Sequence, residues 1–304
     1  ALWAFIDLIS SRVLFTVYLE SAPAIVLREY VNLIKEKYQV PIKGAVSDKQ
    51  SNIETCFKDY FPEIPHQICT FHFAQNVWSH LKLKDGALHK AIRKVINKSY
   101  FLTTSATAEV FFEEHGKLRP RDVFGPIIRD LKKMKRYRNK KFEQLRGIWF
   151  YEQMRTYTTQ MWEQASSLPE DYRMCKIFVR EAEKWEHVLD ETEELYKQVC
   201  ELFQRFRTIN GLLYSSELTA DEIEVQLDAT FSEIETFLKK SNPDYNRDDL
   251  RSFLAKSGSS YKDILGEWVR LWHSYRSGLF VYPKFSQPIK TIVALEQGFG
   301  QQKS

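Results

Sequence analysis

AVSDKQ at residues 45–50, followed by FPEIPHQICTFHF at residues 61–73, combines short apolar runs with residues that usually separate strands from helices. The first run ends in Asp48 and is typical of a buried strand, and the second contains a short strand at residues 67–70. Between them, residues 52–60 have helical spacing. Helices that alternate with strands predict an α/β layer here.

Toward the N-terminus the pattern predicts a hairpin and then a helix. Residues 2–9 and 13–19 are rich in strand-forming residues, and Ser10-Ser11-Arg12 suits a short connection between them. Apolar residues then recur at helical spacing over residues 24–37. With the strand that ends at Asp48, the expected order is β-β-α-β.

Toward the C-terminus, a helix at residues 73–83 precedes a region, residues 84–282, that we expect to be almost entirely helical. The clearest case is residues 182–206, where an apolar stripe from Trp185 to Phe206 follows three-four spacing. Its other face is charged and expected to be solvated, although self-association through the stripe is an alternative. Among the turns, Thr219-Ala220-Asp221-Glu222 resembles a helix start. A last helical stretch is expected at residues 289–301.

Composition excludes two classes of protein. The 304 residues are 43% hydrophobic and 14% aromatic, too much for an intrinsically disordered chain. No apolar run approaches the roughly 18 residues of a membrane span, so no membrane partner is expected. With 44 Lys plus Arg against 40 Asp plus Glu, the net charge of +4 permits a nucleic-acid partner without requiring one.

The cellular setting is expected to be cytoplasmic. Four cysteines are too few for a disulfide framework in a chain of this length. The opening residues, ALWAFIDLIS, read as the middle of a strand and lack the pattern of a signal peptide. We therefore expect the chain to be a piece of a longer protein.

Two groups of residues carry candidate chemistry. Asp48 ends a strand, where reactive carboxylates of α/β sheets gather, but it also suits a cap of the following helix. A second group contains soft or borderline metal ligands: Cys56, His66, Cys69 and His72. Their types suit zinc, whereas the alternative is that the cysteines and histidines have structural roles.

The two quoted stretches together resemble the middle of a DDE-type transposase with a ribonuclease H-like catalytic core, as in insertion-sequence and Mutator-like transposases. In that family an Asp ends the fourth strand and a Cys-x-x-His motif lies where the fifth strand passes into a helix; Asp48, Cys69 and His72 match in order. The resemblance implies an α/β fold, with a ribonuclease H-like mixed sheet interrupted by a large all-helical insertion domain. The implied domains are residues 1–84, the first part of the core and lacking its first strand; residues 85–284, the helical insertion; and residues 285–304, a returning core helix.

The resemblance also implies three catalytic acids. Glu296 in TIVALEQGFG (residues 291–300) matches the family's last acid, but Ile292 and Val293 stand where the family has two asparagines. Asp7 is the possible first acid. Such a sheet, however, begins with three strands before its first helix and only two are found here, so we expect the first acid upstream and Asp7 to be a strand-end carboxylate.

The implied activity is metal-dependent cleavage and strand transfer of DNA at transposon ends. Asp48, Glu296 and the missing acid would hold two Mg²⁺ or Mn²⁺ ions, because hard cations prefer carboxylate oxygens. Cys69 and His72 would lie beside the metals, with His72 contacting the scissile phosphate or supporting a ligand. The alternative is a catalytically inactive or domesticated remnant that binds DNA or protein.

The strongest basic stretch runs from Arg129 to Arg146, and its only acidic residues are Asp130 and Glu143. Such a surface attracts phosphates, so we expect contact with the DNA backbone and association with the nucleoid, whereas a solvated face is the alternative. Base recognition does not follow. The cations expected to contact DNA are Lys132, Lys133, Lys135, Arg136, Arg138, Lys140 and Lys141.

Overall fold

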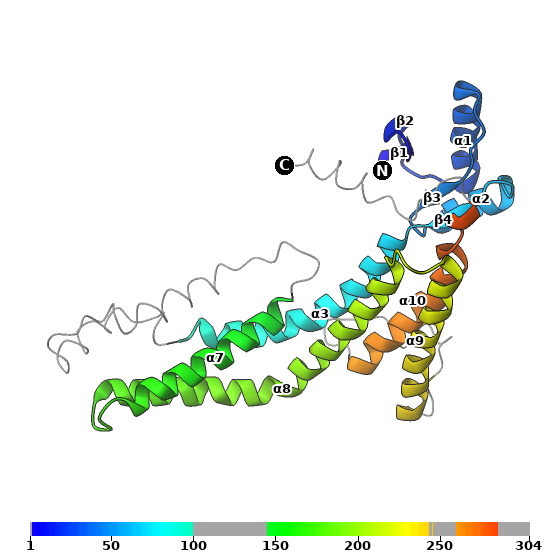
Figure 1. Ribbon diagram of the computed structural model, residues 1–304. Helices are drawn as coiled ribbons and strands as arrows, with labels where there is room; N and C mark the ends of the chain where they lie inside the picture. The colour runs from blue at the N-terminus through cyan, green and yellow to red at the C-terminus, as the bar shows by residue number, and fades with distance from the viewer. Residues whose placement is uncertain (1, 100–144, 243–244, 246–259, 285–304) are drawn as a thin grey trace. The chain divides into compact units, whose positions relative to one another are not determined.

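A computed structural model describes residues 2–99, 145–242, 245 and 260–284 (Figure 1). Helices hold 71% of these residues and strands 9%. The strands are β1 (Leu2–Asp7), β2 (Arg12–Tyr18), β3 (Ala45–Ser47) and β4 (His66–Ile68). The helices are α1 (Ala24–Tyr38), α2 (Ser51–Tyr60), α3 (Thr70–Ile96), α7 (Arg146–Ser166), α8 (Arg173–Leu213), α9 (Ala220–Ser241) and α10 (Tyr261–Leu279), followed by the short 3-10 helix η1 (Tyr282–Lys284).

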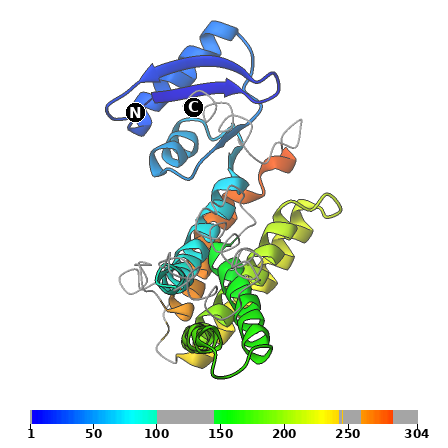
Figure 2. The same cartoon turned by 90° about the vertical axis from the view of Figure 1, so that its left-hand side faces the viewer.

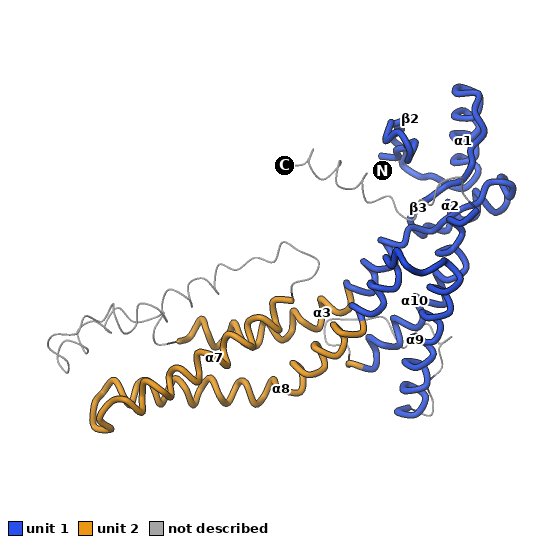
Figure 3. Tube along the Cα trace, viewed as in Figure 1, with its two compact units in different colours: residues 1–78, 206–254, 262–304 blue, residues 79–205, 255–261 orange. Residues whose placement is uncertain are grey.

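The chain divides into two compact units (Figure 3). Unit 1 comprises residues 1–78, 206–254 and 262–304, and unit 2 comprises residues 79–205 and 255–261. Both α3 and α8 contribute residues to each unit. The division of the chain into residues 1–84, 85–284 and 285–304 stays a prediction.

The expected ribonuclease H-like mixed sheet is wrong. In the described part of the chain, β1 pairs only with β2 and β3 only with β4, which gives two sheets of two strands each. β3 and β4 are only three residues long, and they follow Gly44 and Pro65, residue types that interrupt strands. The resemblance covered short motifs, whereas the extent of a sheet depends on pairing between distant segments. A local match therefore did not predict the sheet.

The N-terminal hairpin and helix are confirmed. β1 and β2 pair antiparallel with a register shift at Phe5/Ile6, and Figure 2 shows them as a two-stranded ribbon in the darkest blue. Ser11 in the connecting turn has a positive φ of 56°. Side chains of α1 and α2 form one hydrophobic cluster that includes Leu27, Val31 and Cys56. Partly buried Trp3 and Phe5 of β1 pack against the same cluster.

The helix after β4 is longer than expected. α3 begins at Thr70 rather than residue 73, and it continues past residue 83 to Ile96. Gly86 lies within α3, and the helix tolerates it because a single glycine costs a long helix only about 1 kcal/mol.

The helix start at residues 219–222 is confirmed: the Glu222 amide donates to Thr219 Oγ1 at 3.3 Å, and the Thr219 amide donates to Glu222 Oε2 at 2.8 Å. This reciprocal pair satisfies two N-terminal amides of α9.

In unit 2, a side chain of α3 caps the start of α7. The Ile148 amide donates to Asp85 Oδ1 at 3.1 Å, and Asp85 is only 4% exposed. Burial raises the pKa of Asp85, and hydrogen bonds from the amides of Gly147 and Ile148 oppose that shift. A Cβ at Gly147 would lie 2.5 Å from the Asp85 carbonyl oxygen. Glycine is therefore needed at this close approach.

The apolar stripe of α8 is buried in the single chain. Trp185, Val199 and Leu202 are 0% exposed, and Phe206 is 3% exposed. These four side chains pack within the chain, whereas Val188, Tyr196 and Phe203 of the same stripe are half-buried, so self-association through the stripe stays a prediction. None of the described helices has both the length and the apolar character needed to cross a bilayer.

Candidate functional site around Asp48

The candidate site lies in unit 1 where β3 and β4 end. The strands are parallel, with Ser47 opposite Ile68 as the last pair. The residues that follow, Asp48 and Cys69, leave these strand ends together, because the Cys69 amide donates to the Ser47 carbonyl oxygen at 2.7 Å. The carboxyl ends of parallel strands are the usual ligand-binding edge of α/β proteins.

The Asp48 carboxylate is half-buried and only partly engaged. Its Oδ2 accepts a hydrogen bond from Gln50 Nε2 at 2.7 Å, whereas Oδ1 accepts none from the described residues. The alternative role as a helix cap is not seen, because the N-cap of α2 is Gln50 and no side chain caps that helix. Asp48 therefore keeps a carboxylate oxygen for another ligand.

Lys49, the next residue, is bound by α10. Its Nζ donates to the backbone oxygen and the hydroxyl of Ser274, and it lies 4.9 Å from the ring centroid of Tyr275. Burial lowers the pKa of Lys49, against the opposing effect of the Glu54 charge. The ammonium is thus held by a carbonyl, a hydroxyl and an aromatic face rather than by an ion pair.

The phenol of Tyr275 links α10 to α3 at the same place. Its oxygen accepts a hydrogen bond from Asn76 Nδ2 at 2.8 Å. Burial is the largest cause that raises the pKa of Tyr275; the Asn76 bond opposes it and the Asp48 charge adds to it. The phenol is therefore close enough to Asp48 to sense its charge.

Gln67 of β4 joins the other end of α10 to the strand pair. The amide is fully buried, and its Nε2 donates to the carbonyl oxygens of Ile68 at 2.7 Å and Leu279 at 2.6 Å. Its Oε1 accepts from the amides of Val281 at 2.9 Å and Tyr282 at 3.0 Å. One side chain therefore satisfies four backbone groups and returns the chain to β4 after α10.

Sequence reasoning missed Lys49, Gln67, Asn76, Ser274 and Tyr275. Their contacts join residues that are up to 225 positions apart, so no local pattern could pair them. Gly278 of α10 packs closely on Ile68, where a Cβ would lie 2.5 Å from the isoleucine Cδ1, so a glycine is needed at this contact.

The Cys-x-x-His motif occupies the turn from β4 into α3. Cys69 is 0% exposed, and the Phe73 amide donates to its carbonyl oxygen at 3.4 Å. His72 is half-buried in the first turn of α3, with its ring edge-on to Phe71 at 6.0 Å. The motif therefore begins opposite the end of β3, where the Cys69 amide binds the Ser47 carbonyl oxygen, while its chemical role stays a prediction.

The zinc hypothesis is wrong. Cys56, His66, Cys69 and His72 are all described, and no group of three His, Cys, Asp or Glu in the described residues could hold a metal ion. Cys56 lies in the hydrophobic cluster, where burial raises the pKa of its thiol. The His66 ring stacks on Phe57 at 4.7 Å and its Nε2 lies 2.8 Å from Ser47 Oγ. Burial lowers the pKa of His66 to about 4.

For magnesium, the described residues at the ends of β3 and β4 provide an incomplete set of ligands. Asp48 has the right chemistry, a carboxylate with an unengaged oxygen, but the described residues place no second and third acid beside it. Glu296, the expected partner, lies outside the described residues.

Asp7 has a local role at the end of β1. Its carboxylate accepts hydrogen bonds from the amides of Ile9 and Ser10, each at 3.2 Å, and from the Ser10 hydroxyl. The hydroxyl is the largest of the causes that lower the pKa of Asp7. Asp7 ends a strand of one sheet and Asp48 follows a strand of the other, and both oxygens of Asp7 serve the hairpin turn.

The basic stretch also lies outside the described residues, including Lys132, Lys133, Lys135, Arg136, Arg138, Lys140 and Lys141.

Comparison of the sequence and the structure with protein-family models, curated proteins and solved structures finds no match.

Proposed function

We propose that this chain is the catalytic region of a DDE-type transposase, an enzyme that cleaves DNA at transposon ends and transfers the strands with Mg²⁺ or Mn²⁺. One observation carries the proposal: the 2.7 Å hydrogen bond between the Cys69 amide and the Ser47 carbonyl, which brings the two motifs of the resemblance side by side. The proposal depends on these strand ends and not on a larger sheet. A protein with this function is expected on the nucleoid.

Asp48 is the described residue best suited to bind the metal. Its Oδ2 is held by Gln50, which fixes the orientation of the carboxylate, while Oδ1 stays open. Bound metal ions would activate the attacking water or 3′ hydroxyl and stabilise the leaving oxygen. Glu296 is the proposed second ligand.

His72 is proposed to contact the scissile phosphate. It lies in the first turn of α3, where backbone amides point toward the strand ends and favour a negative charge. Cys69 is fully buried, and its carbonyl oxygen accepts a hydrogen bond from the Phe73 amide in the first turn of α3, so we propose that it supports this turn.

The test is cleavage of DNA that carries the element's own ends by the full-length protein, with MgCl₂, MnCl₂ or EDTA. We expect strand cleavage with either metal and none in EDTA. Asp48→Asn should remove cleavage and leave DNA binding intact, and Asp59→Asn, on the exposed surface of α2, is the matched control. A wild-type protein that binds DNA and never cuts it would instead be the inactive remnant that Ile292 and Val293 favour.

A further inference from the structure

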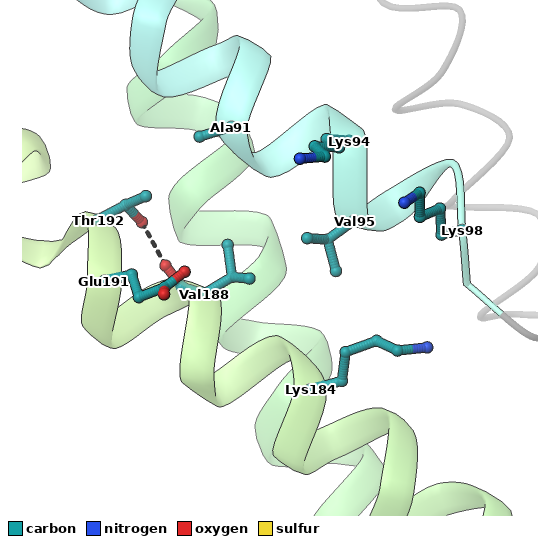
Figure 4. A pocket seen from close by; sticks show the side chains of 8 residues that line it. All are labelled: Ala91, Lys94, Val95, Lys98, Lys184, Val188, Glu191 and Thr192. Carbon is teal, nitrogen blue, oxygen red and sulfur yellow. Dashed lines mark hydrogen bonds between the residues drawn. The ribbon is translucent and has the colours of Figure 1, made fainter.

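A pocket of about 400 Å³ lies in unit 2 between the last turns of α3 and the middle of α8 (Figure 4). Apolar side chains of both helices, among them Val95 and Val188, form part of its lining. The hydroxyl of Thr192 donates to the Val188 carbonyl oxygen at 2.7 Å, so this polar group is already engaged by its own helix. The interior therefore offers few groups that would select a particular small molecule.

Three lysines give the pocket its charge. Lys94 is exposed in the last turn of α3, Lys98 is exposed two residues past the end of that helix, and Lys184 comes from α8. Neither Lys94 nor Lys98 forms an ion pair with any residue that the structure describes. Lys94 and Lys98 are like charges close together along the chain, so an anion placed between them would reduce their mutual repulsion.

Two acids, Glu181 and Glu191, lie near the three lysines and compensate part of their charge. Glu191, the acidic residue in the lining, has its Oε1 3.3 Å from His187 Nε2. In Figure 4, Lys98 and Lys184 lie toward one end of the pocket and Glu191 toward the other. Lys184 Nζ also lies 2.6 Å from the buried carboxylate of Glu181, which holds it at the pocket.

We propose that this lysine-rimmed pocket binds the phosphate backbone of double-stranded DNA. Lys94 and Lys98 are four residues apart along the chain, and their flexible side chains can reach neighbouring phosphates. Lysine acts as a point charge, so it binds phosphates without needing a fixed geometry. The choice of DNA as the polyanion rests on the proposed function, but the surface is separate from Asp48 and binds irrespective of base sequence.

The experiment measures fluorescence anisotropy of a labelled duplex of about 20 base pairs with the full chain, in EDTA, from 50 to 300 mM KCl. The test variant is Lys94→Gln with Lys98→Gln, which leaves the Lys184–Glu181 pair intact. Two lost phosphate contacts should lower the slope of log affinity against log salt by about 2 and weaken binding about tenfold or more at 150 mM. Adding Lys184→Gln should lower the slope by about one more.

The matched control is Lys197→Gln with Lys239→Gln, which removes the same charge from exposed lysines paired with Glu193 and Glu235. It should change affinity less than about twofold. An unchanged affinity and slope in the test variant, with circular dichroism and melting unchanged, would overturn the proposal.

Poly-glutamate of similar charge tests the alternative partner. If it binds the wild-type chain as tightly as the duplex does, and the test variant loses both, the pocket is a site for acidic polypeptides and the proposal is wrong. Binding in EDTA does not need catalysis, so a protein that binds through this pocket but does not cut DNA would overturn only the proposed function.

Discussion

Asp7 and Asp48 both end a strand, but their carboxylates have different surroundings. After β1 the chain turns back at once, and the turn amides and the Ser10 hydroxyl engage both oxygens of Asp7. After β3 the chain enters α2 without a side-chain cap, and Asp48 keeps one oxygen unengaged among the described residues. The comparison teaches that the segment after a strand, and not the strand end itself, determines whether a carboxylate is available for chemistry.

The largest expected effect tests the two aspartates directly. In the full-length protein, Asp48→Asn should slow metal-dependent cleavage by about 1,000-fold, since it removes about 4 kcal/mol of transition-state stabilisation by a metal ligand. Asp7→Asn should leave the rate within about threefold. Single-turnover cleavage rates at saturating metal measure both. If both substitutions slow cleavage equally, Asp7 is the first catalytic acid, and the proposed difference between the two aspartates is wrong.

Gln67→Leu should destabilise the Asp48 end by about 3 kcal/mol, because four backbone groups lose their buried partner. The free energy of unfolding in urea measures the effect. Gln75→Leu, exposed on α3, should change it by less than about 0.5 kcal/mol. A loss of equal size in the Gln75→Leu control would show that the Gln67 bonds to the end of α10 do not hold this site.

His66 should make the β3–β4 pair sensitive to mild acid. Its pKa in the folded chain is about 4, below the ordinary 6.5, so the unfolded chain binds more protons between these values. Stability should therefore fall by about 2 kcal/mol as the pH drops from 6.5 to 4. Urea unfolding at several pH values should show this slope, and His66→Gln should remove it. A slope that survives the substitution would assign it to another group.

Asp7→Ala should cost the hairpin about 1 kcal/mol, the usual contribution of a partly exposed turn hydrogen bond. Because the folded-state pKa of Asp7 is lowered, its stabilisation is fully present above the unfolded value of 3.8 and is lost as the pH falls through the folded pKa. An NMR titration of the Asp7 carboxyl measures that pKa. The hairpin should thus respond only to stronger acid than the β3–β4 pair, and a titration at or above 3.8 would contradict this.

Local patterns predicted the local structure. The hairpin, α1 and the capping box of α9 each follow from residues fewer than twenty positions apart, and the neighbourhood of Asp48 with Cys69 follows from two strands joined by one helix. The prediction of a ribonuclease H-like mixed sheet was wrong, because short motifs do not specify how many strands pair. Lys49 with Ser274 and Gln67 with Leu279 could not be paired from the sequence, because 225 and 212 positions separate them.

The hydrogen bonds of Gln67 to the residues at the end of α10 also affect how the chain folds while the ribosome makes it. At about 5 to 20 residues per second, a ribosome needs roughly 10 to 40 s to reach Leu279 after it has made Gln67, which lies 212 positions earlier. During this interval the backbone groups of Leu279, Val281 and Tyr282 are not yet available to β4. The Gln67 side chain must therefore form its hydrogen bonds with water. A nascent chain is therefore expected to protect β4 from hydrogen exchange only after α10 has left the ribosome.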